Sequence, residues 1–225
     1  MSTLLDVITE ANLLATGKAT APANTTSRYA TLKSLANYCQ RMWQDEPTID
    51  GWDSLYITVS LPSTISATDT YALTASVREI SRRDGDYIYV LHTDGTTKTY
   101  YELVEIDQLQ SYAIGGYRVV ARNGSNLVFS IAFTSADPQF GGTIKIPCYT
   151  TVSTLSDDSN IVQVDDPTWP FLAMAAEYCR VKTSLQGRVD GLVARANEVM
   201  DKMKAMQDGN NSSTQRESIG ISRTW

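Results

Sequence analysis

The chain contains only one histidine, His92, among its 225 residues. A catalytic nucleophile usually needs a neighbouring base, and histidine is the side chain that most often serves as one. His92 lies in a strand pattern at the mouth of a predicted hairpin, so we interpret it as a cross-strand or surface residue without a chemical role. We expect that the chain is not an enzyme. The enzymatic alternative is a hydrolase that uses His92 or the aspartates near residue 160.

Cysteine is also scarce, and the three cysteines, Cys39, Cys148 and Cys179, are too few and too widely spaced for a disulfide framework. They fall in a predicted helix, a predicted strand and a second predicted helix, which argues against a zinc site. We therefore expect buried thiols and a reducing compartment.

Ligands for metal ions and phosphates are equally sparse. One acidic concentration is present, comprising Asp157, Asp158, Asp165 and Asp166. Hard cations favour clustered oxygens, but this segment lacks the glycine and the closing glutamate of a calcium-binding loop. The pairs Gly115-Gly116 and Gly141-Gly142 lack the rest of a phosphate-binding loop, so we interpret them as turns. We expect neither a metal site nor a cofactor.

The charge balance and the hydropathy exclude two further classes of protein. The chain has 19 basic and 25 acidic residues, and its net charge of −6 disfavours sequence-specific DNA binding, which needs a clustered basic surface. No stretch approaches the roughly 20 apolar residues that cross a bilayer. Residues 1–17 lack the positive flank and the apolar run of a secretory signal. We expect synthesis in the cytoplasm and no membrane association.

Apolar residues at steps of three and four predict two helices near the start of the chain. The first runs over about residues 3–15. The second follows a plausible N-cap at Thr26 or Ser27. It ends at Pro47, because the residue before a proline is disfavoured in a helix.

The helical period returns in the last third of the chain. Asp166 suits an N-cap and Pro167 suits the first helical position, so we expect a helix to begin there. The apolar pattern then continues to about residue 206. Gly187 predicts a break or a kink, since glycine disfavours a helix interior by about 1 kcal/mol relative to alanine.

Between these helical regions the period changes to two and the composition shifts to Tyr, Val, Ile and Thr, which indicates a β domain. The turn dipeptides Asp84-Gly85, Asp94-Gly95 and Asn123-Gly124 predict antiparallel hairpins. Residues 105–112 could form one helical turn, and Gly115-Gly116 would let the chain bend into the next strand. The predicted strands are residues 54–61, 71–79, 87–92, 97–104, 117–122, 126–133 and 143–152.

These patterns predict an α+β protein with helices from both ends of the chain in a helical platform, an inserted antiparallel β domain and an extended C-terminal arm. We place the N-terminal helices in residues 1–51, the β domain in 52–156 and the C-terminal helices in 157–207. The arm covers 208–225. It is rich in Asn, Ser, Gln and Gly and cannot bury enough surface to fold alone.

The arm ends in an unusual set of side chains, namely Arg216, Ile219, Ile221, Arg223 and Trp225. A terminal tryptophan beside spaced isoleucines is unfavourable in water, so we predict that the arm docks on a partner. It would add to a sheet edge or lie in a groove, with Trp225 as the buried anchor. An ordinary frayed terminus is the alternative.

Several stretches, taken in their order along the chain, carry a resemblance to a known family. They are ITEANLLATGK (8–18), RMWQDEPTIDGWDSLY (41–56), VREISRRDGDYIYV (77–90), RNGSNLVF (122–129), PQFGGTIKIPCY (138–149), VDDPTWPFLAMAAEY (164–178) and ANEVMDKMKAM (196–206). With them the whole chain resembles the head-to-tail adaptor proteins of tailed bacteriophages. The likeness covers nearly all of residues 1–207, and it depends on the order of the stretches, because none of them is a catalytic signature.

The resemblance implies an adaptor ring subunit that connects the portal to the tail at the neck of the virion and extends the DNA channel. Its partners would be the portal protein, a tail nozzle or tail-tube protein, and identical subunits in a ring that matches a dodecameric portal. Genomic DNA would pass through without specific binding, which agrees with the acidic balance. We assign portal attachment to Arg216, Ile219, Ile221, Arg223 and Trp225, with arginines supplying charged hydrogen bonds.

Many small adaptors are nearly all helical, so the inserted β domain is a departure from the family pattern. It could bind the tail nozzle, a fibre or a decoration protein. The strands are rich in tyrosine, and the rings of Tyr87, Tyr89, Tyr100 and Tyr101 could stack on sugars, although aromatic residues are common in any strand. The alternative function is therefore a carbohydrate- or receptor-binding β module of a phage tail.

Overall fold

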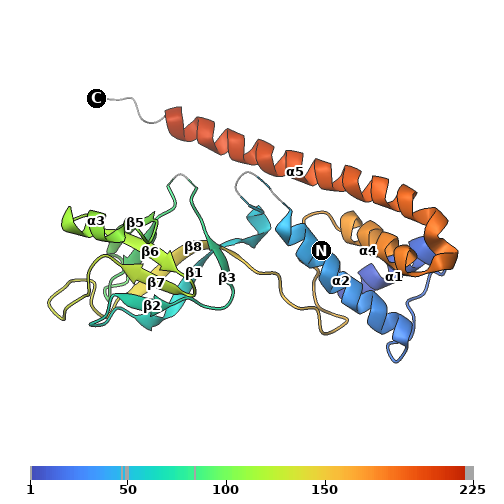
Figure 1. Ribbon diagram of the computed structural model, residues 1–225, viewed down its shortest axis with the longest axis horizontal. Helices are drawn as coiled ribbons and strands as arrows, with labels where there is room; N and C mark the ends of the chain where they lie inside the picture. Colours follow the sequence, from blue (N-terminus) through green and yellow to red (C-terminus); the bar gives the residue numbers. More distant parts are fainter. Residues whose placement is uncertain (1, 47, 49–50, 84, 221–225) are drawn as a thin grey trace. The chain divides into compact units, whose positions relative to one another are not determined.

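The computed structural model describes residues 2–46, 48, 51–83 and 85–220, and it divides into two compact units (Figure 1). One unit combines residues 1–54 with residues 152–225 and is helical, whereas the other spans residues 55–151 and is mainly β. The predicted mixture of α and β structure is confirmed. None of the helices in the described part of the chain is long and apolar enough to cross a membrane.

The helical unit begins with α1 (Leu4–Thr16), whose ends carry clear local signals. Thr3 and Asp6 form a reciprocal capping box at its start, and Gly17 ends it with a φ of 77°. Helix α2 (Ser27–Asp45) starts after Thr26, whose hydroxyl accepts the N–H of Tyr29 at 3.2 Å. Both N-terminal helices were predicted and are confirmed.

The C-terminal part contributes α4 (Thr168–Val181), a 3₁₀ segment η2 (Thr183–Arg188) and α5 (Val189–Gly220). The break predicted at Gly187 is confirmed, since this residue lies in η2 between the two helices. Both ends of the chain supply the core, which includes Leu4, Ile8, Leu32, Cys39, Trp43, Leu172, Met174 and Cys179.

The extended arm predicted over residues 208–225 is wrong for its first part, because α5 continues without interruption to Gly220. Once a helix has formed, extending it by one residue needs much less free energy than starting a new helix. No proline interrupts this segment. The last five residues, which include Ile221, Arg223 and Trp225, lie outside the described residues.

The β unit follows a short 3₁₀ turn, η1 (Asp53–Leu55). Its strands join into one sheet in the order β1-β8-β4-β5-β6-β7-β2, and β3 also pairs with β8. Strands β1 and β2, at the two ends of this order, contact each other, so the sheet nearly closes. The strands are β1 (Tyr56–Thr64), β2 (Thr70–Ala72), β3 (Val77–Ile80), β4 (Ile88–Leu91), β5 (Lys98–Val104), β6 (Val119–Asn123), β7 (Asn126–Phe129) and β8 (Thr143–Thr150).

Two of the three predicted hairpin turns are confirmed. Asp94-Gly95 joins β4 to β5, and Asn123-Gly124 joins β6 to β7, with both glycines at positive φ. The hairpin at Asp84-Gly85 is wrong, because β3 and β4 both pair with β8 rather than with each other. The predicted strand 71–79 is also divided, by a turn in which the N–H of Val77 donates to Thr74.

The β unit is not purely antiparallel as predicted, because β5 and β6 run parallel. The chain between them forms the short helix α3 (Leu109–Ile114), followed by Gly115 and Gly116. This crossover returns the chain to the same end of the sheet, as a parallel pair requires. The core contains a cluster of aromatic rings in edge-to-face contact, formed by Tyr71, Tyr101, Phe129 and Phe133.

Candidate functional site

His92 occupies the cross-strand position that we predicted. Its Nε2 lies 2.8 Å from Oγ1 of Thr99 on β5, and its backbone N–H donates to the carbonyl of Thr97 at 2.9 Å. Both bonds serve the β4–β5 hairpin. Across the residues that the structure describes, no three His, Cys, Asp or Glu side chains lie close enough together to hold a metal ion.

The three cysteines are unpaired and buried, as predicted. Burial, together with the negative charge of Glu177, raises the pKa of the Cys39 thiol to about 12. A thiol with so high a pKa holds almost no thiolate at neutral pH, and the thiolate is the reactive form. Cys39 is therefore a packing residue of the helical unit.

Three of the four aspartates that are close in sequence have separate roles. Asp158 accepts a hydrogen bond from the hydroxyl of Tyr29. Asp166 accepts the N–H of Thr168 at 2.7 Å, and α4 begins at Thr168, one residue later than predicted. Asp165 instead lines a pocket.

The amide side chains of α2 hold the segment 152–163, which we call the strap. Asn37 both donates to the carbonyl of Leu155 at 3.1 Å and accepts its N–H at 2.8 Å. Gln44 accepts the N–H of Val152 at 2.7 Å. The strap therefore finds in these side chains the partners that a neighbouring strand would otherwise supply.

Gln40 lies between these two residues on α2 and is only 1% exposed. Its amide donates to the carbonyl of Ser153 and accepts the N–H of Gln163, both at 2.8 Å. We did not predict this role. The signal was present, because positions 37, 40 and 44 follow helical spacing beside the apolar stripe of the same helix.

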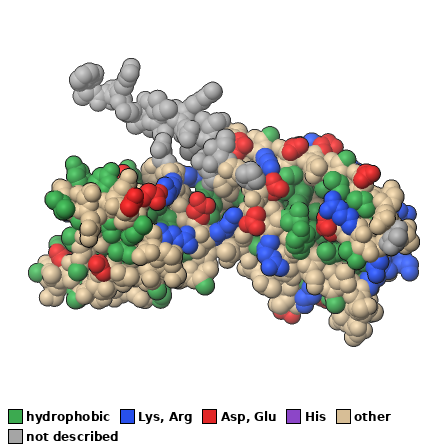
Figure 2. Space-filling model, viewed as in Figure 1, with side chains coloured by type: hydrophobic (Ala, Val, Ile, Leu, Met, Phe, Trp, Pro, Cys, Tyr) green, Lys and Arg blue, Asp and Glu red, His purple; other side chains and the backbone are tan. Residues whose placement is uncertain are grey.

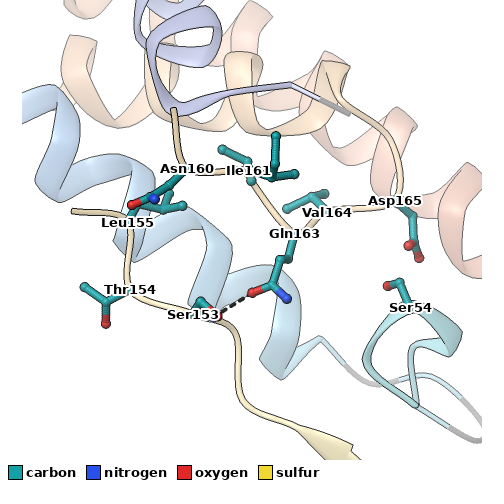
Figure 3. A pocket seen from close by; sticks show the side chains of 10 residues that line it. Ser54, Ser153, Thr154, Leu155, Asn160, Ile161, Gln163, Val164 and Asp165 are labelled. Carbon is teal, nitrogen blue, oxygen red and sulfur yellow. Dashed lines mark hydrogen bonds between the residues drawn. The ribbon is translucent and has the colours of Figure 1, made fainter. Parts of the chain in front are cut away.

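The strap and the residues that follow it form a pocket of about 590 Å³. Figure 3 shows residues 153–155 on one side and residues 160–165 on the other, with the carboxylate of Asp165 directed toward Ser54. Such a pocket can accept an apolar group next to a hydrogen-bond donor. Its lining comprises Ser54, Ser153, Thr154, Leu155, Asn160, Ile161, Val162, Gln163, Val164 and Asp165.

The carboxyl of Asp165 is the electrostatically unusual group of this pocket. Burial raises its pKa above the ordinary value of 3.8, and the charge of Asp53 raises it further, while a hydrogen bond with Ser54 partly opposes the shift. The folded protein therefore binds a proton on Asp165 more readily than the unfolded chain does. Stability from this group is present at low pH and is lost as the pH rises through the raised pKa.

We expect Asp165→Asn to increase the free energy of unfolding at neutral pH, because the amide removes a negative charge that lies next to the charge of Asp53. The increase should shrink as the pH falls through the raised pKa of the wild-type carboxyl, because the folded protein then binds the proton that removes the charge. Urea unfolding of both proteins between pH 3 and pH 7 measures the difference. If the variant's free energy of unfolding exceeded that of the wild type by the same amount at every pH, this account of Asp165 would be contradicted.

Asp94→Asn is the control for Asp165→Asn, because its expected effect on the free energy of unfolding has the opposite sign. Hydrogen bonds from the hydroxyl of Thr97 and from the N–H groups of Thr96 and Thr97 lower the pKa of Asp94. A lowered pKa contributes stability above the unfolded value that is lost as the pH falls. Asp94→Asn should therefore reduce stability at neutral pH, with the deficit disappearing in acid.

Three of the four tyrosines considered for sugar stacking share the outer face of the β4–β5 hairpin. Tyr89 lies opposite Tyr100 with ring centroids 5.8 Å apart, and Tyr87 is 6.1 Å from Tyr100. Lys98 places its Nζ 4.9 Å from the centroid of the Tyr89 ring. Tyr101 points inward and is only 2% exposed, so we withdraw it from this group.

The residues predicted to bind the portal fall in the last part of the chain. Arg216 and Ile219 belong to the final turns of α5, which the structure describes by its backbone. Ile221, Arg223 and Trp225 lie outside the described residues. The assignment of all five to portal attachment stays a prediction.

No family model matches the chain, and no curated protein gives a significant match. We therefore base its function on its own residues and geometry, together with the resemblance described from the sequence.

Proposed function

We propose that the chain is a structural virion protein, an adaptor ring subunit that connects the portal of a tailed bacteriophage to its tail. The ordered resemblance over residues 1–207 supports this proposal. So does the architecture, in which both ends of the chain fold into one helical unit and a β unit is inserted between them. In the assembled neck the helical unit forms the platform of the ring, and each subunit contacts the next head to tail.

The single observation that carries the proposal is the length of α5, which has 32 residues. Where its side chains are described, the buried residues recur at helical spacing at Leu192, Ala196, Met200, Met203 and Gln207. The backbone helix then continues for 13 residues to Gly220, roughly 20 Å at 1.5 Å per residue. A helix of this length can reach a partner.

Attachment to the portal is assigned to the end of this helix and the residues after it. Trp225 serves as the apolar anchor, because buried tryptophans dominate the energy of many interfaces. Ile219 and Ile221 add apolar contacts. Arg216 and Arg223 donate charged hydrogen bonds to carboxylates of the portal.

Co-sedimentation with the portal ring of the same phage tests this proposal. We expect the full chain to bind, and a chain that ends at Gly209 to lose binding by at least about tenfold. This truncation retains Gln207, whose side chain accepts the N–H of Asp53 at 3.3 Å. Trp225→Ala should weaken binding as well.

The matched control is Met206→Ala, which removes a side chain on α5 that is 71% exposed and precedes the truncation. This variant should bind like the wild type. Equal binding by the full and truncated chains would be compatible with the adaptor role, but it would contradict the assignment of portal attachment to the end of the chain. No binding by either chain would contradict the adaptor role.

The shared face of Tyr87, Tyr89 and Tyr100 favours a second candidate, a carbohydrate- or receptor-binding module of a phage tail. Exposed rings stack on the apolar faces of sugars, and Tyr87 and Tyr100 are 49% and 52% exposed. Saturable binding on a glycan array that Tyr100→Ala abolishes would support this candidate. A broad array without any bound glycan would remove it.

A further inference from the structure

Four neighbouring strands of the β unit align one row of side chains on its outer face, and we call Ser60, Lys145, Tyr89 and Tyr100 the outer row. Lys145 on β8 lies opposite both Ser60 on β1 and Tyr89 on β4. Tyr89 in turn lies opposite Tyr100 on β5. The neighbours of the row along β8, β4 and β5 are buried, so the row itself faces outward. These neighbours are Ile144, Ile146, Ile88, Val90, Thr99 and Tyr101. Hydrophobic and basic side chains both lie exposed on the surface of this unit (Figure 2).

Two lysines hold their ammonium groups beside Tyr89. Nζ of Lys145 donates to Oγ of Ser60 at 2.6 Å. Lys98, two residues before Tyr100 on β5, places its Nζ 4.9 Å from the centroid of the Tyr89 ring. In the part of the chain that the structure describes, neither lysine forms an ion pair. Both positive charges are therefore available to a ligand, and side chains that are already ordered lose little entropy on binding it.

The carboxylates around the outer row are engaged elsewhere or lie at its far side. Asp86 accepts hydrogen bonds from the hydroxyls of Tyr56 and Ser81. Asp94 accepts three hydrogen bonds within its own turn. Glu102 lies two residues beyond Tyr100 on β5, in the direction away from Lys98. A negatively charged group is thus attracted to the side of the row where the two lysines lie.

The strands under the outer row restrict the kind of ligand. Strand β8 pairs with β1 and β4, and β4 pairs with β8 and β5, so a peptide strand cannot add to the sheet here. Two lysines on a chain of net charge −6 do not make the extended basic surface that a nucleic acid needs. An exposed tyrosine ring beside an ammonium group instead matches a sugar ring that carries a carboxylate.

We infer that the outer row binds an acidic saccharide through a uronate residue. The sugar ring stacks on Tyr100, which is 52% exposed, and the carboxylate accepts hydrogen bonds from Lys98 and Lys145. The inference goes beyond the adaptor role and rests on the second candidate function, to which it adds the charge of the ligand. Because the attraction is electrostatic and lies at the surface, binding weakens as the salt concentration rises.

The test is titration calorimetry of the full chain with trisaccharides of galacturonate, glucuronate and mannuronate, each beside its carboxyl-reduced, neutral form. We expect at least one uronate to bind, and its reduced form to bind at least about tenfold more weakly. Lys98→Gln and Lys145→Gln should each weaken uronate binding by at least about tenfold and leave binding of the reduced form unchanged. Tyr100→Ala should weaken both forms, because it removes the ring on which either sugar stacks.

The matched control is Lys202→Gln, which changes the net charge equally but alters an exposed lysine of α5 that pairs with Glu198 at 2.6 Å. This variant should bind the uronate like the wild type. Equal losses in Lys202→Gln and Lys98→Gln would overturn the inference, because net charge alone would then explain them. Equal binding of a uronate and its reduced form would overturn it and leave the second candidate intact. If no uronate binds, the inference is wrong, whereas a broad array without any bound glycan removes the second candidate as well.

Discussion

Trp43→Ala should destabilise the helical unit by about 3–5 kcal/mol, the range for removing a large aromatic side chain from a core. Trp43 is fully buried on α2, and its ring stacks on that of Trp52 with centroids 5.0 Å apart. Nε1 of Trp52 also donates to the carbonyl of Trp43 at 2.8 Å. Truncation leaves a cavity beside a second tryptophan. Denaturant unfolding followed by far-ultraviolet circular dichroism measures the loss.

Trp43→Phe is the control for this prediction. The phenyl ring keeps much of the volume, and the substitution removes Nε1, a buried donor without a hydrogen-bond partner in the described structure. An unpaired buried donor is unfavourable, so its removal offsets part of the lost packing. Trp43→Phe should therefore cost much less than Trp43→Ala. Equal losses would show that ring packing is not what holds α2 in the unit.

Gly142→Ala should have the largest effect on the β unit, at about 3 kcal/mol. An added Cβ would lie 2.7 Å from the carbonyl oxygen of Leu91 and 2.8 Å from that of Gln139. Both are backbone atoms, so the backbone of β4 and of the 139–142 turn would have to move. Gly142 also accepts the N–H of Ile65 at 2.8 Å, next to the pairing of β4 with β8. Hydrogen exchange of the β8 amides should increase with the loss of stability.

Gly124→Ala is the control for Gly142→Ala, because it distinguishes a loss of stability caused by steric overlap from one caused by the backbone conformation. Gly124 has a φ of 59° and no other atom within 4 Å of an added Cβ, so the variant carries only the cost of a left-handed residue, about 1 kcal/mol. If Gly142→Ala cost no more than Gly124→Ala, the close approach of β4, β8 and the 139–142 turn would be wrong.

The helices and two hairpins could be predicted from the sequence because their signals are local. Thr26 caps the start of α2 with its own hydroxyl, and Asp94-Gly95 and Asn123-Gly124 impose the geometry of tight turns. At α4 the predicted N-cap, Asp166, is off by one residue, because the helix starts at Thr168 after Pro167. These signals lie within a few residues of the structure that they specify.

The sheet order could not be predicted, because it depends on contacts that are distant in sequence. Strand β8 pairs with β1, β3 and β4, and the nearest of these ends more than 50 residues earlier. Nothing in a strand's own alternation selects its neighbour. The parallel pairing of β5 with β6 likewise depends on how the α3 crossover packs against β6 rather than on strand composition.

The candidate site was predicted only in part. Tyr89 and Tyr100 lie on one face of the sheet, in agreement with the tyrosine pattern. Neighbouring residues of a strand point to opposite faces, so Tyr101 could not share that face with Tyr100, and it is buried. The amide contacts of Gln40 were missed because a glutamine on a helix usually faces water. Its partners, Ser153 and Gln163, come from the other end of the chain.

Native mass spectrometry of the portal ring incubated with an excess of this chain tests the adaptor role most directly. An adaptor that closes a ring on the portal predicts one chain bound per portal subunit, with few partly filled rings because neighbouring subunits support each other. Portal rings that remain bare, or that bind only one or two chains at saturation, would contradict the proposed function.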